Sequence, residues 1–365
     1  MPLSDDSHAT PTYDLHYFDA NSLYPFSALT NRFVVGPGVR LIGPDMLSRL
    51  RLDREKGHFV YADPQEGGQL KECDGMIMVT IGLEPDNHEV NRLPFLPIRL
   101  SGKGQQEESF QASCYTCLVK RQKSLCRHDR LQRRFCQVYT MNEVAYAVCE
   151  LNYTLYSVHE ALVYCSLEPI FSEYIKLLSS LKIRNAGVPQ EFQHDVAAYC
   201  SQVNDAMSYT TEADRLTPEK MQNNPYACKF FKGVLNISLG KFSQTDLHPQ
   251  VEYVHEEERL SQLYNDGTID ILSCFLVTEK TMQVTYQKKE TCLKVNKRSQ
   301  VVLNAMVTSL SRVYMYRHLR LLERNGADLL YIDTDGIIFG LAGTRRSRSL
   351  TMGRLKERTR GIYAK

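Results

Sequence analysis

The chain has 365 residues, 43% of them hydrophobic, which is enough to build a substantial core spread over roughly two or three lobes. Its 44 Lys and Arg residues nearly balance its 42 Asp and Glu residues, so the overall charge indicates no polyanionic partner. The eleven Cys residues are scattered, the N-terminus lacks the apolar core of a signal peptide, and no apolar run approaches about 18 residues. These features exclude a disordered chain and predict a soluble intracellular protein with free or metal-bound thiols and no membrane partner.

The first half of the chain mixes strand and helix signals. Residues 13–29 read as a strand, a turn at Ala20 and Asn21, and the start of a helix. Gly and Pro are dense in the loop that follows. Further along, the pattern predicts a strand over 76–83, an extended stretch over 92–100, alternating helix and strand over 138–164, and an amphipathic helix over 169–183.

The second half has clearer boundaries. A helix is predicted over 223–242, with Pro225 in its first turn and Gly240 near its end. Residues 251–258 and 281–289 are strand-like, and a long helix over 299–325 is placed to end at Gly326. This helix leads directly into "LLYIDTDGIIFG", a strand whose apolar, β-branched and aromatic residues predict burial.

Two carboxylates interrupt that apolar strand. On a strand or tight hairpin, Asp333 and Asp335 project to the same side because they are two residues apart. Hard oxygen ligands at one point suit Mg²⁺, which takes one or two protein carboxylates and leaves its other positions to water and phosphates. Asp19, which ends another apolar strand, is the best candidate for a further ligand. The alternative is an ordinary hairpin turn in which Gly336 supplies a positive φ.

Three segments in order make the chain resemble a B-family DNA polymerase of the protein-primed branch, which includes adenoviral enzymes and Maverick or Polinton transposons. The pattern D-x-x-S-L-Y-P is present from Asp19 to Pro25, K-x-x-x-N-S-x-[YW]-G-K-F appears in altered form as "KGVLNISLGKF" (232–242), and Y-x-D-T-D-S appears as "YIDTDG" (331–336). The similarity runs from about residue 13 to 339. It implies a fragment that holds the palm and fingers.

The resemblance implies catalytic roles for Asp19, Asp333 and Asp335. Asp19, Ala20 and Asp335 match the positions that bind two Mg²⁺ ions, for which Mn²⁺ can substitute. Asp333 matches an acid that assists the site without always binding metal. The implied reaction transfers a deoxynucleotide from a dNTP to a primer 3′-hydroxyl on a DNA template, and the first primer is the hydroxyl of a terminal protein.

The same resemblance implies a nucleotide site. Ser22, Leu23 and Tyr24 belong to it, and the Tyr24 ring would exclude a ribose 2′-hydroxyl, although a core aromatic is the alternative. Lys232 and Asn236 are four residues apart on one helix face, with Lys229 one turn earlier. Lysines there would meet triphosphate oxygens as point charges. A second stripe is predicted to pack the helix down: Phe230, Phe231, Val234 and Leu235.

Several positions depart from the family pattern. Leu239 replaces the usual Tyr or Trp, Ile237 replaces Ser, Gly336 replaces the Ser after the acidic pair, and Cys228 stands where Arg is common. These departures favour a rival hypothesis, a decayed polymerase that only binds nucleic acid. A two-metal nuclease or phosphohydrolase is a second rival, but hydrolysis does not need a helix with a nucleotide-binding Lys and Asn.

A cysteine-rich stretch suggests a second metal. Cys114, Cys117, Cys126 and His128 supply four ligands of the kind that hold tetrahedral Zn²⁺, and free surface thiols are the alternative. The same stretch is basic and is predicted to contact template phosphates, unless it is simply a solvated face. Its cations are Lys120, Arg121, Lys123, Arg127, Arg130, Arg133 and Arg134.

The expected fold class is α/β (α+β), a palm with an antiparallel sheet backed by helices. The predicted organisation is the N-terminal palm (1–45), an insertion similar to a terminal-protein region (46–165), helical fingers (166–250), the C-terminal palm (251–345) and a basic tail that begins a thumb (346–365). The cysteine cluster lies in the insertion. A nuclear location is expected if the host is a eukaryote or a virus of one.

Overall fold

A computed structural model describes residues 14–20, 22–64, 67–100, 108–209, 211–243, 249–292 and 300–341. The chain divides into two compact units, one formed by Met1–Asn236 with Ala305–Lys365 and the other by Ile237–Asn304. Antiparallel sheets combined with helices confirm the predicted mixed α/β class. Asn21 and the basic tail over 346–365 lie outside the described residues, and the predicted domain boundaries remain predictions.

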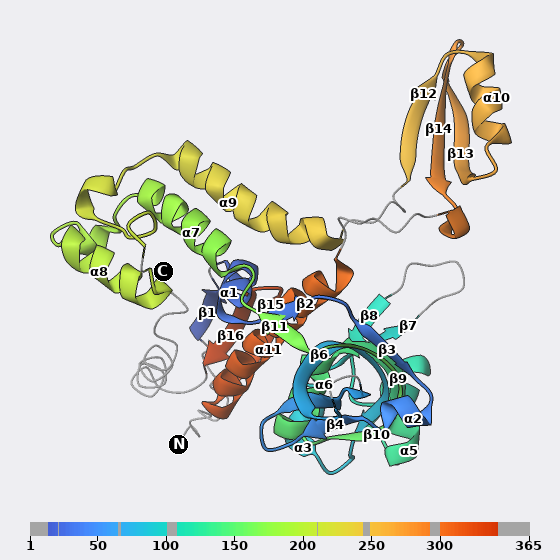
Figure 1. The fold of residues 1–365 in the computed structure, drawn as a ribbon, viewed down its shortest axis with the longest axis horizontal. Helices are drawn as coiled ribbons and strands as arrows, with labels where there is room; N and C mark the ends of the chain where they lie inside the picture. Colours follow the sequence, from blue (N-terminus) through green and yellow to red (C-terminus); the bar gives the residue numbers. More distant parts are fainter. Residues whose placement is uncertain are drawn as a thin grey trace, which may run out of the picture. The chain divides into compact units, whose positions relative to one another are not determined.

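The sheet that carries the acidic residues joins the two ends of the chain. Its strand order is β1 (Asp14–Asp19), β16 (Gly336–Leu341) and β15 (Ala327–Asp333), and both pairings are antiparallel. Phe339 and Ile337 are fully buried on one face, in the same core as apolar residues of helix α11 (Val301–Arg324). Figure 1 shows α11 running beside this sheet.

The prediction that the acidic strand is buried is wrong. β15 is an edge strand of the sheet, and Tyr331 is 57% exposed. The apolar residues of β16, in the centre, occupy the buried position instead. The run of β-branched and aromatic residues therefore predicted a strand correctly but not its burial. Residues 330–333 are all exposed at the end of this edge strand, which has a neighbouring strand on one side only.

A larger antiparallel sheet forms around β6, and Figure 1 shows it curling round α6. Its path is β3 (Val39–Ile42), β10 (Tyr153–Tyr164), β6 (Leu70–Leu83), β5 (His58–Ala62) and β4 (Leu50–Asp53), and β9 (Phe135–Thr140) also pairs with β6. Strand pairs β2 (Phe33–Val35) with β11 (Ser166–Glu168) and β7 (Pro97–Leu100) with β8 (Glu108–Gln111) complete the sheets of this unit.

Helices of the larger unit cover these sheets and extend from them. They are α1 (Leu23–Thr30), α2 (Pro44–Leu47), α3 (His88–Arg92), α4 (Tyr115–Val119), α5 (Arg130–Arg133), α6 (Met141–Glu150), α7 (Ser172–Ala186) and α8 (Val196–Met207). Helix α9 (Pro225–Gly240) matches the helix predicted from its terminal Pro and Gly, and α11 matches the long helix predicted from periodicity. Among the described residues, no helix is both long and apolar enough to cross a membrane.

The smaller unit is a three-stranded antiparallel sheet with one helix. Its strand order is β12 (Gln250–Val254), β14 (Thr281–Lys288) and β13 (Ile269–Thr278), and helix α10 (Glu257–Asn265) packs through Leu263 into the sheet's core. The strand predicted over 251–258 ends at Val254, so its last part was wrongly assigned. Glu257 and Glu258 begin α10 instead, since glutamate favours a helix and its charge favours the first turn.

Candidate active site

The hairpin between β15 and β16 places one carboxylate in its turn. Thr334 and Asp335 separate the paired residues Asp333 and Gly336. The positive φ predicted at Gly336 lies at Thr334 instead, at 52°. A β-branched residue in this conformation is a genuine outlier, of the kind found where a functional site constrains the backbone. The hairpin alternative is therefore correct in geometry, and the turn itself presents Asp335.

The same turn is attached to the end of β1. The Ala20 N–H donates to the Asp335 carbonyl oxygen at 2.8 Å. Gly336 pairs with Asp19 on one side and with Asp333 on the other. Because paired residues of antiparallel strands share a face, Asp19 and Asp333 lie on one face of the sheet, on either side of Gly336. The turn adds Asp335 close enough for both charges to act on it. Residues from opposite ends of the sequence are thus brought together as predicted.

The carboxylates repel one another at this end of the sheet. Burial and the neighbouring Asp19 charge raise the pKa of Asp335, and Asp333 adds to the effect, whereas Lys232 opposes it. Asp19 and Asp335 are partly exposed, and Asp333 is exposed. A cluster of like charges that remains open to solvent fits a divalent cation, which would relieve the repulsion and still reach a substrate.

The carboxylates do not form a closed cage by themselves. Among the described residues, one group of three or more potential ligands gathers closely enough to hold a metal ion alone, and it is the cysteine cluster. Mg²⁺ commonly takes only one or two carboxylates and completes its shell with water and substrate phosphates. The open arrangement is therefore the one expected where the substrate supplies ligands.

Tyr17 adds a neutral partner that sequence reasoning missed. Its hydroxyl donates to Asp19 Oδ1 at 3.3 Å, and Asp19 with burial raises the pKa of Tyr17. A Cβ atom placed on Gly336 would lie 3.1 Å from the Tyr17 hydroxyl oxygen. The departure from Ser to Gly at this position thus leaves room for Tyr17 to reach Asp19.

Two lysines lie at the predicted nucleotide site, Lys232 near Asp335 and Lys182 near Ser22. Lys232 on α9 acts electrostatically on Asp335 and on Lys182 of α7. Lys182 donates to the Ser22 hydroxyl at 3.0 Å, and burial with the Lys232 charge lowers the pKa of Lys182. An amphipathic helix was predicted around Lys182, but no sequence pattern marked this residue as part of the site. Its half-buried position between Ser22 and Lys232 is visible only in the fold.

The start of α1 carries the other predicted nucleotide residues. Ser22 adopts a left-handed conformation with φ 55°, and its hydroxyl does not cap the helix. The Leu23 side chain is buried, as is Ala20, so these residues offer only backbone atoms to a ligand. Tyr24 is 38% exposed, and burial and the Asp335 charge raise its pKa. Tyr24 is therefore neither a core aromatic nor remote from the carboxylates.

The other predicted residues of α9 are two nucleotide-binding candidates and an apolar packing stripe. Lys229 and Asn236 are exposed, and within the described ranges neither makes a hydrogen bond or ion pair with the three carboxylates. The packing stripe is correct for Leu235, which is buried, but wrong for Phe230, which is 65% exposed. Phe230 contacts Phe231 at the helix surface instead of a core.

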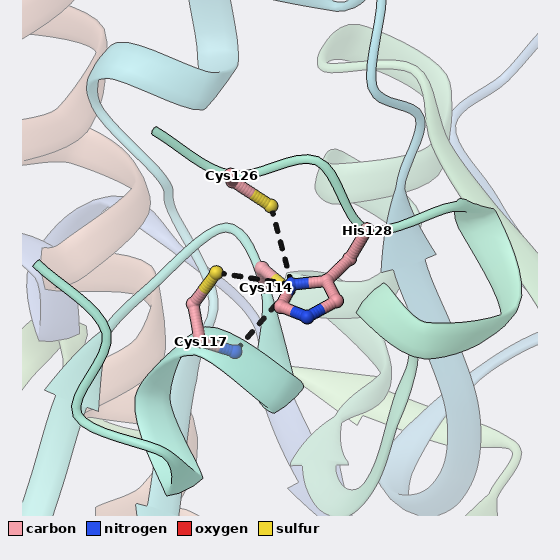
Figure 2. Close-up of side chains that lie close together, drawn as sticks. All are labelled: Cys114, Cys117, Cys126 and His128. Atoms are coloured by element: carbon pink, nitrogen blue, oxygen red, sulfur yellow. Dashed lines mark hydrogen bonds between the residues drawn. The ribbon is translucent and has the colours of Figure 1, made fainter. Parts of the chain in front are cut away.

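The cysteine cluster is assembled by a short helix and a chain reversal (Figure 2). Cys114 precedes α4, Cys117 lies within it, and a left-handed residue, Arg121, turns the chain back after the helix. The Nδ1 atom of His128 lies 3.5, 3.2 and 3.6 Å from the sulfurs of Cys114, Cys117 and Cys126. The four predicted ligands are thus brought together and can hold a metal ion.

Arg133 packs against the cysteine cluster inside the protein, so the prediction that it contacts template phosphates with the other cations of the basic stretch is wrong. It is buried, donates to the Leu83 carbonyl at 3.0 Å and to Cys126 Sγ at 3.3 Å, and also contacts Asn91. Burial raises the pKa of Cys126, but hydrogen bonds from the His128 backbone and from Cys117 outweigh it and lower the pKa to about 7. Arg134 lies over the Tyr156 ring.

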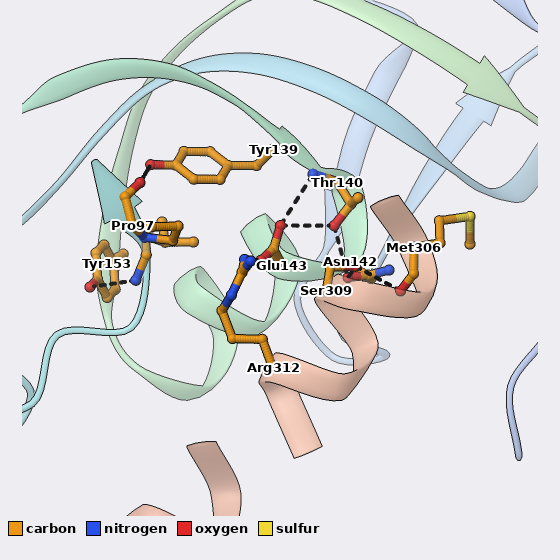
Figure 3. Close-up of polar contacts among 10 residues, drawn as sticks. Pro97, Tyr139, Thr140, Asn142, Glu143, Tyr153, Met306, Ser309 and Arg312 are labelled. Carbon is orange, nitrogen blue, oxygen red and sulfur yellow. Dashed lines mark hydrogen bonds and ion pairs between the residues drawn. The ribbon is translucent and has the colours of Figure 1, made fainter. Parts of the chain in front are cut away.

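A buried ion pair joins α6 to α11 near the candidate site (Figure 3). Arg312 is paired with Glu143, whose side chain is 4% exposed and which also accepts from the Thr140 hydroxyl at 3.1 Å. Helix α1 is held on α11 by the Ser311–Ser27 hydrogen bond of 2.8 Å and by contact between Phe26 and Tyr314. The position of Tyr24 therefore depends on α11.

No family model and no curated protein matches this sequence. Among solved structures, phi29 DNA polymerase with primer-template DNA and incoming nucleotides is similar at 13% identity and a TM-score of 0.44, over 92% of this chain and 42% of that one. The same polymerase with primer-template DNA alone gives 12% identity and a TM-score of 0.42, over 93% and 40%. The chain thus spans about two fifths of these structures' length, and so distant a likeness transfers no activity.

Proposed function

We propose that the chain performs template-directed DNA synthesis, the transfer of a deoxynucleotide from a dNTP to a primer 3′-hydroxyl. The observation that carries the proposal is the convergence of Asp19 and Asp335. The Ala20 N–H, next to Asp19, donates to the Asp335 carbonyl oxygen at 2.8 Å and joins the end of β1 to the turn. The sequence motifs place these acids in the order found in protein-primed B-family polymerases. The agreement between this motif order and the geometry supports the proposed function.

Asp19 and Asp335, with the Ala20 backbone, would hold two Mg²⁺ or Mn²⁺ ions. When bound, such ions lower the pKa of the primer hydroxyl and stabilise the leaving pyrophosphate. Tyr17 would keep the Asp19 carboxylate oriented through its 3.3 Å hydrogen bond. Asp333, one strand away across Gly336, would add negative charge without having to bind an ion directly.

The triphosphate would lie against the cationic side of the site. Lys232 and Lys182 supply two charges near Asp335 and Ser22, and α1 presents its N-terminal turn, where backbone N–H groups favour anions. Lys229 and Asn236 would contribute from α9, the helix that carries Lys232. Tyr24 would lie under the sugar and exclude a 2′-hydroxyl by its volume. These cations also favour a polymerase over a metal-dependent nuclease.

The cysteine cluster is proposed to bind structural Zn²⁺. Ligands about 2.3 Å (sulfur) and about 2.05 Å (nitrogen) from a tetrahedral zinc ion are about 3.6 Å apart. The three observed sulfur-to-nitrogen distances, 3.2 to 3.6 Å, fit that spacing. Arg133 would supply the outer hydrogen bond to Cys126 that metal-bound thiolates commonly have.

The proposed partners are primer-template DNA, dNTPs and a terminal protein that supplies the first hydroxyl. The terminal protein and a nuclear location follow from the family resemblance alone. The rival hypothesis, a remnant that only binds nucleic acid, rests on Leu239, Ile237 and Cys228. Gly336 no longer favours that rival, since it makes space for a contact to Asp19.

Primer extension with Mg²⁺ tests the proposal. The intact chain should extend a labelled primer, and Asp19→Ala and Asp335→Ala should each lower the rate by at least about 100-fold, the scale of losing one electrostatic clamp. Asp328→Ala is the matched control, because this exposed aspartate lies on β15 at the end away from the turn. Equal extension by all four proteins, or primer shortening in place of extension, would refute the assignment.

A further inference from the structure

A wide groove lies beside the cysteine cluster and has no role in the function proposed above. Residues of β7, β8 and α4 line it, together with the loop that follows α4. Its volume is about 1240 Å³. Pockets for small molecules usually measure about 300–1,000 Å³, so this groove suits an extended ligand.

The lining of the groove is basic. Arg92, Arg99 and Arg121 line it and are exposed, and none of them forms an ion pair with a carboxylate among the residues that the structure describes. Among the described residues that line the groove, Glu108 is the single acidic one. The chain around Arg121 adds three exposed cations, Lys120, Lys123 and Arg127, and the exposed Arg130 begins α5. Such unpaired charge attracts a polyanion through its phosphates.

Aromatic side chains distinguish the kind of polyanion. Phe110 and Tyr115 line the groove and are 36% and 37% exposed. Exposed rings next to cations form a surface on which unpaired bases stack, whereas the bases of a duplex already stack on each other. Gln111 in the lining is exposed and can donate to or accept from base edges. Gln122 and Gln137 also line the groove but already donate to backbone carbonyls, so they offer their amide oxygens as acceptors.

We propose that this groove binds single-stranded nucleic acid, with arginines on the phosphates and the two rings on the bases. The cysteine cluster forms one wall, because Cys114, Cys117 and Cys126 all line the groove. A bound metal would fix the loop that carries Arg121 and its neighbouring cations. The proposal rests on the proposed function only for the source of the strand, the unpaired template.

Fluorescence anisotropy with a labelled mixed-sequence single-stranded DNA tests the groove, using the zinc-loaded full chain without Mg²⁺ or dNTP. Arg99→Gln combined with Arg121→Gln should weaken binding by about tenfold and lower the salt slope by about 1.4, the value for two lost phosphate contacts. Phe110→Leu should weaken it by at least about fivefold. The matched control, Arg51→Gln with Arg54→Gln, removes two exposed arginines elsewhere and should retain the wild-type affinity.

Competition by unlabelled RNA, duplex DNA and an acidic peptide identifies the ligand. Unlabelled single-stranded DNA or RNA should displace the labelled probe. The better competitor of the two shows whether the groove prefers DNA or RNA. Equal or better competition by duplex or peptide, or an equal loss in the control pair, would overturn the proposal. A protein that binds single strands but fails to extend primers would refute the polymerase assignment and leave the groove proposal intact. A protein that extends primers but does not bind single strands through the groove would refute only the groove proposal.

Discussion

Removal of Arg312 should reveal how strongly the α6–α11 ion pair supports the site. Glu143 is 4% exposed and Arg312 32% exposed. Breaking a buried pair usually costs about 3–5 kcal/mol. Glu143 keeps its bonds to Thr140, and the arginine is partly solvated, so Arg312→Met should lower the free energy of unfolding by ~3 kcal/mol near neutral pH.

The loss should depend on pH in a defined direction. Burial already raises the pKa of Glu143 above its usual value, and Arg312 is the largest influence that opposes this. Without Arg312 the pKa rises further, so the folded protein binds a proton more readily than the unfolded chain does. Stability is then retained at low pH and lost as pH rises through the folded-state pKa. The Arg312→Met deficit should therefore be larger at about pH 8 than at about pH 5.

Urea unfolding followed by far-UV circular dichroism measures this deficit, since the chain has no tryptophan. The double variant Glu143→Gln with Arg312→Met removes the unpaired charge and should recover most of the lost free energy. A double variant as unstable as Arg312→Met, or a deficit equal at both pH values, would show that the carboxylate charge is not the cause.

Three further predictions concern the two sites. Gly336→Ser, which restores the family residue, should slow primer extension because its Cβ would meet the Tyr17 hydroxyl at 3.1 Å; the same change in a Tyr17→Ala background should cost less, and equal losses in both backgrounds would contradict the contact. Tyr24→Ala should raise incorporation of ribonucleotides relative to deoxyribonucleotides, measured by single-nucleotide extension, and an unchanged ratio would remove the tyrosine from sugar selection. Purified protein should contain one zinc per chain by elemental analysis, and Cys117→Ser should lose it while Cys136→Ser, an exposed thiol outside the cluster, keeps it; metal-free wild-type protein would leave the cluster as thiols.

Much of the fold could be predicted because local patterns agreed with the tertiary structure. The 3.6-residue periodicity of α11 and the Pro and Gly at the ends of α9 correspond to real helices. Burial was harder to predict. The residues before Asp333 have the composition of a core strand, yet β15 is an edge strand, and a single sequence does not reveal which neighbours cover a strand.

The candidate site was predictable where it depends on spacing and unpredictable where it depends on packing. The motif order indicated that Asp19 would meet Asp335, and Cys spacing indicated the cluster. Lys182 and Tyr17 were missed because they reach the site through contacts with Ser22 and Asp19 that arise only on folding. Arg133 was misassigned because a basic run gives no sign of which member turns inward.

Manganese binding followed by electron paramagnetic resonance, with dCTP present, tests most directly whether Asp19 and Asp335 share divalent ions. If the two carboxylates share these ions, Asp19→Ala and Asp335→Ala should each remove the same protein-dependent Mn²⁺ signal, and the double variant should lose nothing more. Losses of Mn²⁺ signal that add in the double variant, or full Mn²⁺ binding in either single variant, would show that Asp19 and Asp335 do not share ions.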